Sequence, residues 1–229
     1  LVKNGENVVT VRIDYRSPNS RWYSGAGIFR KVWLCESSEI RFGNDGIYIS
    51  AKPKDNAWEV EVTSEIVREK SVPIAGVRVR STILDDIGNS IAGYESDACA
   101  VDISCIPEAV RADGSAYSLT TQRMTVEAPT LWDIDEPYLY TMVSEIIVNG
   151  DIVQSVSQRF GFRTIEFTTD KGFFLNGKHI KLHGSCEHHD NGCLGAVFNK
   201  AALRRRFAKL REMGVNAIRT SHNMPAEEF

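Results

Sequence analysis

The stretch NKAALRRRFAKLREMGVNAIR (residues 199–219) decides the fold of the last part of the chain. Its apolar residues Leu203, Phe207 and Leu210 recur at the spacing of one face of an α-helix. The asparagine that opens the stretch is a favoured N-cap, and Gly214 is the residue type that commonly follows the last helical turn. The pattern therefore predicts one amphipathic helix that ends near Gly214.

A short strand is predicted on each side of this helix, at residues 179–183 and at residues 215–219. A helix that connects two neighbouring strands of one sheet makes them run parallel. Repeated strand–helix units build a (β/α)8 barrel, which takes about 250 residues. Far fewer remain at this point of the chain, so the pattern predicts only the first units of a TIM barrel.

A polar cluster follows each of the two predicted strands. The first, GSCEHHD (residues 184–190), contains His188 and His189, and the second, which begins at Arg219, contains His222. The carboxyl ends of neighbouring parallel strands share one edge of the sheet, about 4.8 Å apart. One small ligand could therefore contact His222 together with His188 or His189. Imidazoles are mostly neutral near pH 7 and both donate and accept hydrogen bonds, which suits an uncharged polar ligand.

Residues 40–165 are rich in short, alternating strands that are separated by turn residues, and residues 77–84 are a clear example. Asn149-Gly150 between two apolar runs predicts a two-residue hairpin, and residues 44–46 predict a turn. Such strands over about 120 residues indicate an antiparallel sandwich of immunoglobulin type.

The first part of the chain has a similar alternation on a smaller scale. Val9, Val11 and Ile13 alternate with polar residues before the turn-forming run SPNS (residues 17–20). This pattern predicts strand, turn and strand within residues 4–34. The segment is too short to bury a core of its own, so we expect it to belong to a larger domain.

Five strings spread along the chain carry a family resemblance. They are RWYSGAGIFRKVWL (21–34), LWDIDEPYLY (131–140), FGFR (160–163), GSCEHHD (184–190) and LREMGVNAIRTSHN (210–223). In this order they resemble the glycoside hydrolase family 2 enzymes and, within that family, the β-galactosidases. Several unrelated strings at a family's spacing rarely coincide by chance.

The resemblance implies a multidomain fold of β plus α/β class. Residues 1–38 would be the C-terminal part of a jelly-roll, sugar-binding-like domain, whose other strands would precede Leu1. Residues 39–165 would be a complete immunoglobulin-like β-sandwich. Residues 166–229 would be the truncated start of the (β/α)8 catalytic barrel, that is, the first β/α units of a TIM barrel.

The resemblance also implies a reaction, the hydrolysis of terminal β-D-galactosides with retention of configuration. In this reaction one glutamic acid acts as acid and base, and a second glutamate acts as the nucleophile. In the family these glutamates come from later barrel strands. We therefore expect no catalytic residue within this segment and no turnover by the isolated chain. Glu187, Glu227 and Glu228 are not assigned as the pair, and the last two are expected to be charges at a helix start.

Five residues are expected to bind substrate. The resemblance implies that His189 and His222 line the subsite for the nonreducing sugar, with His188 beside them. Arg219 ends a strand that is expected to be buried, where an unpaired guanidinium is costly, so we expect it to have a partner. The resemblance implies that this partner is the carboxylates of the active site. Asn223 would add a polar contact at the rim. The competing interpretation is that these groups only bond backbone and form structural ion pairs.

Further functions fit parts of the pattern. β-Glucuronidase and β-mannosidase belong to the same family and are the competing sugar specificities. A noncatalytic carbohydrate-binding module, or an immunoglobulin-like structural module, would explain the sandwich alone. Fold by itself says little about function, and the strand–helix–strand unit with its histidines argues against both modules.

Composition limits the partners. The chain has 27 basic and 30 acidic residues, a formal charge of −3, which indicates no nucleic acid or anionic membrane as a partner. Cys186, His188, His189 and Cys193 lack zinc-site spacing, so we expect neither a metal nor a cofactor. The expected partner is a β-galactoside or oligosaccharide substrate. The sequence does not decide whether the protein forms a homo-oligomer. It also does not decide the compartment, whether bacterial cytoplasm, periplasm or extracellular space.

Overall fold

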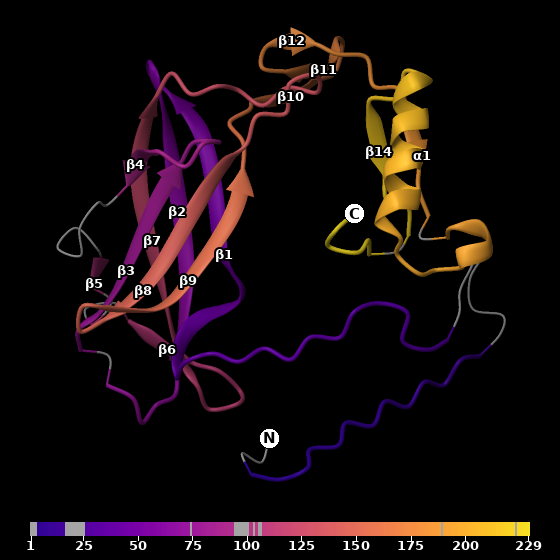
Figure 1. Cartoon of the computed structure of the whole chain (residues 1–229). Helices are drawn as coiled ribbons and strands as arrows, with labels where there is room; N and C mark the ends of the chain where they lie inside the picture. Colours follow the sequence, from indigo (N-terminus) through magenta and orange to yellow (C-terminus); the bar gives the residue numbers. More distant parts are fainter. Residues whose placement is uncertain are drawn as a thin grey trace. The chain divides into compact units, whose positions relative to one another are not determined.

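A computed structural model provides the structure of the chain (Figure 1). It describes residues 4–16, 26–73, 75–93, 101–102, 104, 107–188, 190–222 and 224–229. The chain forms two compact units. The sandwich unit is Cys35–Lys181, and the terminal unit combines Leu1–Leu34 with Leu182–Phe229.

Two antiparallel sheets form the sandwich of the sandwich unit, which confirms the strand-rich pattern. One has the order β1-β2-β7-β6, and the other has the order β4-β3-β8-β9 with β5 also paired to β3. The bounds are β1 Ile40–Lys54, β2 Ala57–Arg68, β3 Val77–Leu84, β4 Ser90–Gly93, β5 Val101–Asp102, β6 Glu108–Val110, β7 Ala116–Glu127, β8 Tyr140–Val148 and β9 Asp151–Phe160.

Alternate residues of the central strands face the core between the sheets. Along β2, Val60 and Val62 are fully buried while their neighbours are partly exposed, which is the period of a half-buried strand. An aromatic cluster closes one end of this core. The ring of Phe162, which is fully buried, lies 4.9 Å from that of Tyr140 and 5.4 Å from that of Trp58, in edge-to-face contacts.

A polar link also crosses this core. Gln122 on β7 is 1% exposed, and its Oε1 accepts a hydrogen bond from Ser81 Oγ on β3 at 2.6 Å. Its Nε2 donates to the carbonyl oxygen of Val79 at 3.1 Å. The amide thus joins the two sheets and satisfies polar groups that would otherwise be costly to bury.

The turn predictions had different outcomes. The hairpin at Asn149-Gly150 is confirmed, since both residues have positive φ (52° and 95°) between β8 and β9. The turn predicted at residues 44–46 is wrong. It is an irregularity inside β1, where the register shifts between Phe42 and Ile47 and the strand then continues on the same partner. Residues that accept positive φ suit bulges as well as turns.

A small three-stranded sheet ends the sandwich unit. It has the order β10-β11-β12, with β10 Ile165–Thr168, β11 Gly172–Leu175 and β12 Lys178–His179. Strands β11 and β12 form a hairpin. Asn176 forms its tip with positive φ, and its side chain donates to the carbonyl oxygen of Trp132, which ties the hairpin to the sandwich.

In the terminal unit, the predicted strand–helix–strand arrangement is confirmed. Helix α1 is Lys200–Glu212, and β13 Gly184–Cys186 pairs parallel with β14 Ala217–Arg219. A 3₁₀ turn at Gly192–Leu194 precedes the helix. Asn199 is the N-cap, with its Oδ1 accepting from the Ala202 N–H at 2.9 Å.

The first parallel strand lies later than predicted. Residues 179–183 do not form it, because His179 is used by β12 in the hairpin with β11. The chain joins the parallel sheet only at Gly184. Asn216 anchors the chain just before that point, since its Oδ1 accepts from the His183 N–H at 2.8 Å.

No strand occurs in residues 4–16 or 26–34, so the strands predicted there are not found in the described part. Val9, Val11 and Ile13 are exposed, and a strand needs a hydrogen-bonded neighbour that no described residue supplies. The run at residues 17–20 lies outside the described residues. The jelly-roll assignment stays a prediction, as do the domain limits at residues 38 and 165. Within the described chain, no helix has the length and apolar character to cross a bilayer.

Candidate functional site

Two loops leave the same edge of the parallel pair. Cys186 at the end of β13 is opposite Arg219 at the end of β14, and the Glu187 N–H donates to the Arg219 carbonyl oxygen at 2.8 Å. The ladder thus extends one residue beyond β13. His188 and His222 lie just past these ends, as expected for the carboxyl edge of parallel strands.

The structure brings His188 and His222 together. Their ring centroids are 5.4 Å apart with 32° between the ring planes, although the residues are far apart in sequence. His188 is half-buried and His222 is exposed. Ser221, with φ of 50°, makes a left-handed turn directly before His222. Such a conformation is costly for a residue with a side chain and is frequent at functional sites.

Two of the expected substrate-binding residues, His189 and Asn223, lie outside the described residues. Their contribution stays a prediction.

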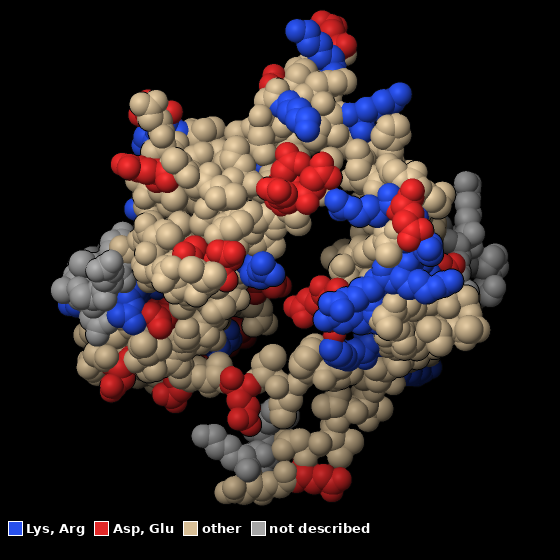
Figure 2. Space-filling model, turned by 45° about the horizontal axis from the view of Figure 1, so that its top comes forward, with Lys and Arg blue, Asp and Glu red and all other residues tan. Residues whose placement is uncertain are grey.

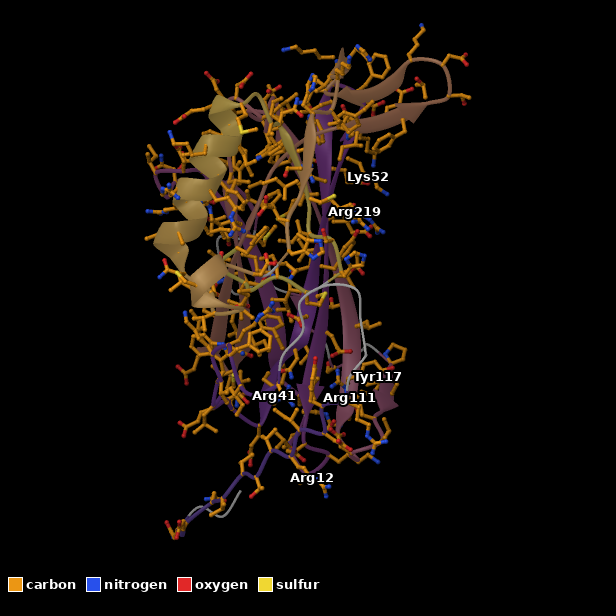
Figure 3. All side chains as sticks on the ribbon, turned by 90° about the vertical axis from the view of Figure 1, so that its right-hand side faces the viewer. Arg12, Arg41, Lys52, Arg111, Tyr117 and Arg219 are labelled. Atoms are coloured by element: carbon orange, nitrogen blue, oxygen red, sulfur yellow. The ribbon has the colours of Figure 1, made fainter. Side chains whose placement is uncertain are left out.

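The burial and pairing of Arg219 differ from what the sequence led us to expect. It was expected to be buried and paired, but it is exposed at the end of β14 (Figure 3). Within the described ranges, its guanidinium has no hydrogen-bond or ion-pair partner. A sheet of two strands with one helix buries little of an arginine at its edge, so the premise of a buried strand was wrong for the described structure.

Arg206 is a site residue that the sequence reasoning missed. It is on α1, and its Nη1 donates to Glu187 Oε2 at 2.8 Å. Its Nη2 donates to the Asp190 carbonyl oxygen at 3.0 Å and to Asn191 Oδ1 at 2.8 Å. One signal was available. Position 206 is three residues after Leu203, so it shares the face of the helix that is turned inward.

A cavity of about 30 Å³ lies beneath this loop, lined among others by Glu187, His188, Leu203, Arg206 and Phe229. That volume holds about one water molecule and no sugar ring.

A larger hollow of about 550 Å³ lies between the first and last parts of the terminal unit, lined by residues 28–31, 33, 197–198 and 225–228. Arg30 donates to the Met224 carbonyl oxygen, and Lys31 forms an ion pair with Glu228. The Lys31 ammonium lowers the pKa of the Glu228 carboxyl. Residues 227–228 form a turn, so the helix start predicted there is wrong.

Two carboxylates of the terminal unit form ion pairs, that of Glu187 with Arg206 and that of Glu228 with Lys31. The groups at the carboxyl edge are a pair of imidazoles and a guanidinium, which are hydrogen-bonding groups suited to a polar ligand. A β-sandwich followed by a strand–helix–strand unit with such groups at its carboxyl edge is the arrangement that the sequence resemblance to a multidomain glycosidase implies.

Comparison with known proteins agrees with that class. The family "Glycosyl hydrolases family 2" matches residues 45–163, more than half of the chain, and "Glycosyl hydrolases family 2, TIM barrel domain" matches residues 166–229. The chain belongs to glycosyl hydrolases family 2. The family resemblance and the immunoglobulin-like and TIM-barrel classes inferred from sequence are thereby confirmed.

The relatives include more than one activity. The chain is 39% identical to the beta-galactosidase BoGH2A of Bacteroides ovatus over 97% of its own length and 25% of that protein. It is 39% identical over 43% of its length to a beta-glucuronidase of Bacteroides fragilis, covering 14% of that protein. A crystal structure of a family 2 member from Bacteroides cellulosilyticus matches 92% of the chain and 26% of that protein, with a TM-score of 0.77 and 31% identity. The chain thus spans about a quarter of the length of BoGH2A and of this solved relative.

Proposed function

We propose that this segment belongs to a retaining β-galactosidase and that it supplies part of the subsite for the nonreducing sugar. The observation that carries the proposal is the meeting of the His188 and His222 rings, 5.4 Å apart, at the carboxyl edge of a barrel-type parallel pair. In this role His222 and His189 hydrogen-bond the sugar hydroxyls, and His188 orients its neighbour. Arg219 and Asn223 add polar contacts at the same rim.

In the proposed reaction, a glutamic acid protonates the leaving oxygen and a second glutamate attacks the anomeric carbon. Water then releases the sugar, with the first residue acting as base. We place both glutamates outside residues 1–229, since the family resemblance puts them on later barrel strands. In the terminal unit, Glu187, Glu212 and Glu228 form ion pairs with Arg206, Lys209 and Lys31. The isolated segment is therefore proposed to bind weakly and not to hydrolyse.

A second candidate is β-glucuronidase activity. A glucuronide carries a carboxylate, and the exposed guanidinium of Arg219, which has no ion-pair partner among the described side chains, is a suitable group to bind it. The relative from Bacteroides fragilis has that name. β-Mannosidase activity, and a noncatalytic carbohydrate-binding or structural module, have no such observation in their favour.

The test is a substrate panel with the full-length protein that contains this segment. Nitrophenyl β-galactoside, β-glucuronide and β-mannoside are compared by kcat/KM. The proposal expects the galactoside to be preferred at least tenfold and expects His222→Ala to lower that kcat/KM. Preference for the glucuronide would favour the second candidate, and no hydrolysis of any of the three would reject the enzymatic proposal. Nitrophenol release by the isolated segment would show that the catalytic groups lie within it.

A further inference from the structure

The guanidinium of Arg206 contacts both ends of the loop that contains positions 188 and 189. Arg206 reaches the carboxylate of Glu187 on one side and Asp190 and Asn191 on the other, at distances between 2.8 and 3.0 Å. Positions 188 and 189 lie between these anchors. The contacts of Arg206 therefore bracket positions 188 and 189, and none of these contacts is made to the ring of His188.

Each anchor is itself fixed. The Glu187 N–H is bonded to the Arg219 carbonyl oxygen, which ties the first anchor to β14. Asn191 donates through its N–H to the Gly195 carbonyl oxygen at 2.8 Å and through Nδ2 to that of Val197 at 3.0 Å. Arg206 therefore connects α1 to two positions that are already set by the sheet and by the turn that follows.

Because the Glu187 carboxylate is buried, its ion pair with Arg206 is hard to replace. The side chain of Glu187 is 9% exposed, and Glu187 is the only buried charged residue among the described residues. A guanidinium offers five donors in a planar fork, whereas an ammonium is a compact charge on a flexible stem. Lysine at this position would keep the charge but would not reach acceptors on both sides of the loop.

The neighbouring arginines have different surroundings. Lys and Arg side chains form a band on the unit that contains α1 (Figure 2). Arg204 and Arg205 on this helix are exposed. Arg206 is the member of this triplet that is turned inward and half-buried. Its role is therefore separable from the general positive charge of the helix.

We propose that Arg206 is a positioning residue for the sugar subsite, which holds the loop of residues 187–191 so that His188 faces His222. It does not touch the sugar. This inference rests on the proposed glycosidase function and adds to it a residue from the barrel helix, outside the two histidine motifs.

A purely structural role would have a different signature. If Arg206 only stabilised the fold, its substitution would lower the melting temperature or the fraction of active molecules, and the remaining molecules would have an unchanged KM. If it positions the subsite, the folded enzyme binds sugar more weakly. KM and ligand affinity therefore distinguish the two roles.

The experiment uses the full-length protein with Arg206→Lys and, as the matched control, Arg205→Lys on the same helix. Hydrolysis of the preferred nitrophenyl glycoside gives kcat and KM, and calorimetric titration with the nonhydrolysable thioglycoside of the same sugar gives affinity. We expect Arg206→Lys to lower kcat/KM about tenfold, mainly through KM, since misplaced binding groups of this kind cost one to two orders of magnitude. Arg205→Lys should stay within about twofold of the wild type.

The outcomes separate the two proposals. A wild type that hydrolyses none of the glycosides overturns the proposed function and this inference with it. An active wild type whose Arg206→Lys variant keeps its KM and affinity overturns the inference alone. If Arg206→Lys does not fold, Glu187→Gln takes its place, because it keeps the shape of the anchor and removes its charge. An unchanged KM in that folded variant equally rejects the positioning role.

Discussion

The two units of the chain hold themselves together by different means. The sandwich unit buries apolar side chains from both sheets, such as Val60, Val79 and Ile146, in one continuous core. In the described part of the terminal unit, the buried residues are one apolar side chain, Leu203, and one charged side chain, Glu187. The sandwich unit therefore depends on hydrophobic burial, and the terminal unit depends far more on hydrogen bonds and ion pairs.

This contrast relates to function. Apolar burial gives a rigid scaffold whose individual residues do little chemistry. Polar links such as the one between Arg206 and Glu187 hold a loop in place without using the imidazole of His188, which lies within it. The comparison predicts that core substitutions have their largest effect on the stability of the sandwich unit, and that polar substitutions matter most at the rim.

The largest effect is expected for Phe162→Ala. The Phe162 side chain is fully buried against Trp58 and Tyr140, so its removal leaves a cavity beside these two rings. We expect the free energy of unfolding of the sandwich unit to fall by about 3–5 kcal/mol. Urea denaturation followed by tryptophan fluorescence measures it. Phe167→Ala, at a position 73% exposed, is the control and should cost far less; equal losses would contradict a core-based account.

Gln122→Leu tests whether polar links also matter inside the sandwich. It removes the partner of Ser81 Oγ and of the Val79 carbonyl oxygen, both inside the core. We expect a loss of about 1–3 kcal/mol in the free energy of unfolding, because buried polar groups are left unsatisfied. A double-mutant cycle with Ser81→Ala measures the coupling. Strictly additive losses would show that the two side chains do not interact in solution.

The features that were predicted correctly depend on local signals. The N-cap at Asn199, the hairpin at Asn149-Gly150 and the alternating strands follow from side-chain chemistry within a few residues. The parallel pairing of the strands around α1 follows from the helix between them. The meeting of His188 and His222 then follows from the shared sheet edge.

The features that were missed depend on competition between distant segments. Residues 179–183 were predicted to form the first parallel strand, but β11 pairs with His179 and delays it to Gly184. The contact of Arg206 with Glu187 depends on how α1 lies over the sheet, which periodicity indicates only as a face. The exposure of Arg219 depends on which neighbours cover β14, and no pattern within the strand contains that information.

A smaller effect, confined to the terminal unit, is expected for Asn199→Ala. The Asn199 Oδ1 accepts from the Ala202 N–H at 2.9 Å at the start of α1. Loss of this cap should lower the local stability of the helix by about 1 kcal/mol. Hydrogen exchange of the α1 amides should then be roughly fivefold faster, with sandwich amides unchanged. Asn199→Ser should restore most of the protection, and faster exchange in both units would contradict an effect confined to the terminal unit.

The smallest effect is expected for a polar pair on the sandwich surface, Arg68 and Glu108. Arg68 Nε and Nη2 donate to the two carboxylate oxygens of Glu108 at 2.5 and 2.6 Å, and this hydrogen bonding lowers the pKa of Glu108 below its ordinary 4.5. A carboxyl whose pKa is lower in the folded state stabilises the fold above its unfolded pKa, and this contribution is lost as pH falls through the folded pKa.

Glu108→Gln should therefore cost about 0.5 kcal/mol at pH 7, the usual size for a partly exposed pair. The difference from the wild type should shrink as the pH falls below about 4.5, the pKa of the carboxyl in the unfolded chain, and through the lower pKa that this carboxyl has in the folded protein. Urea denaturation at about pH 7, 5 and 3.5 measures it, and Glu61→Gln, from a more exposed pair with Arg123, is the control. A loss above about 2 kcal/mol, or a pH-independent one, would mean that polar links carry the sandwich unit as well as the terminal unit.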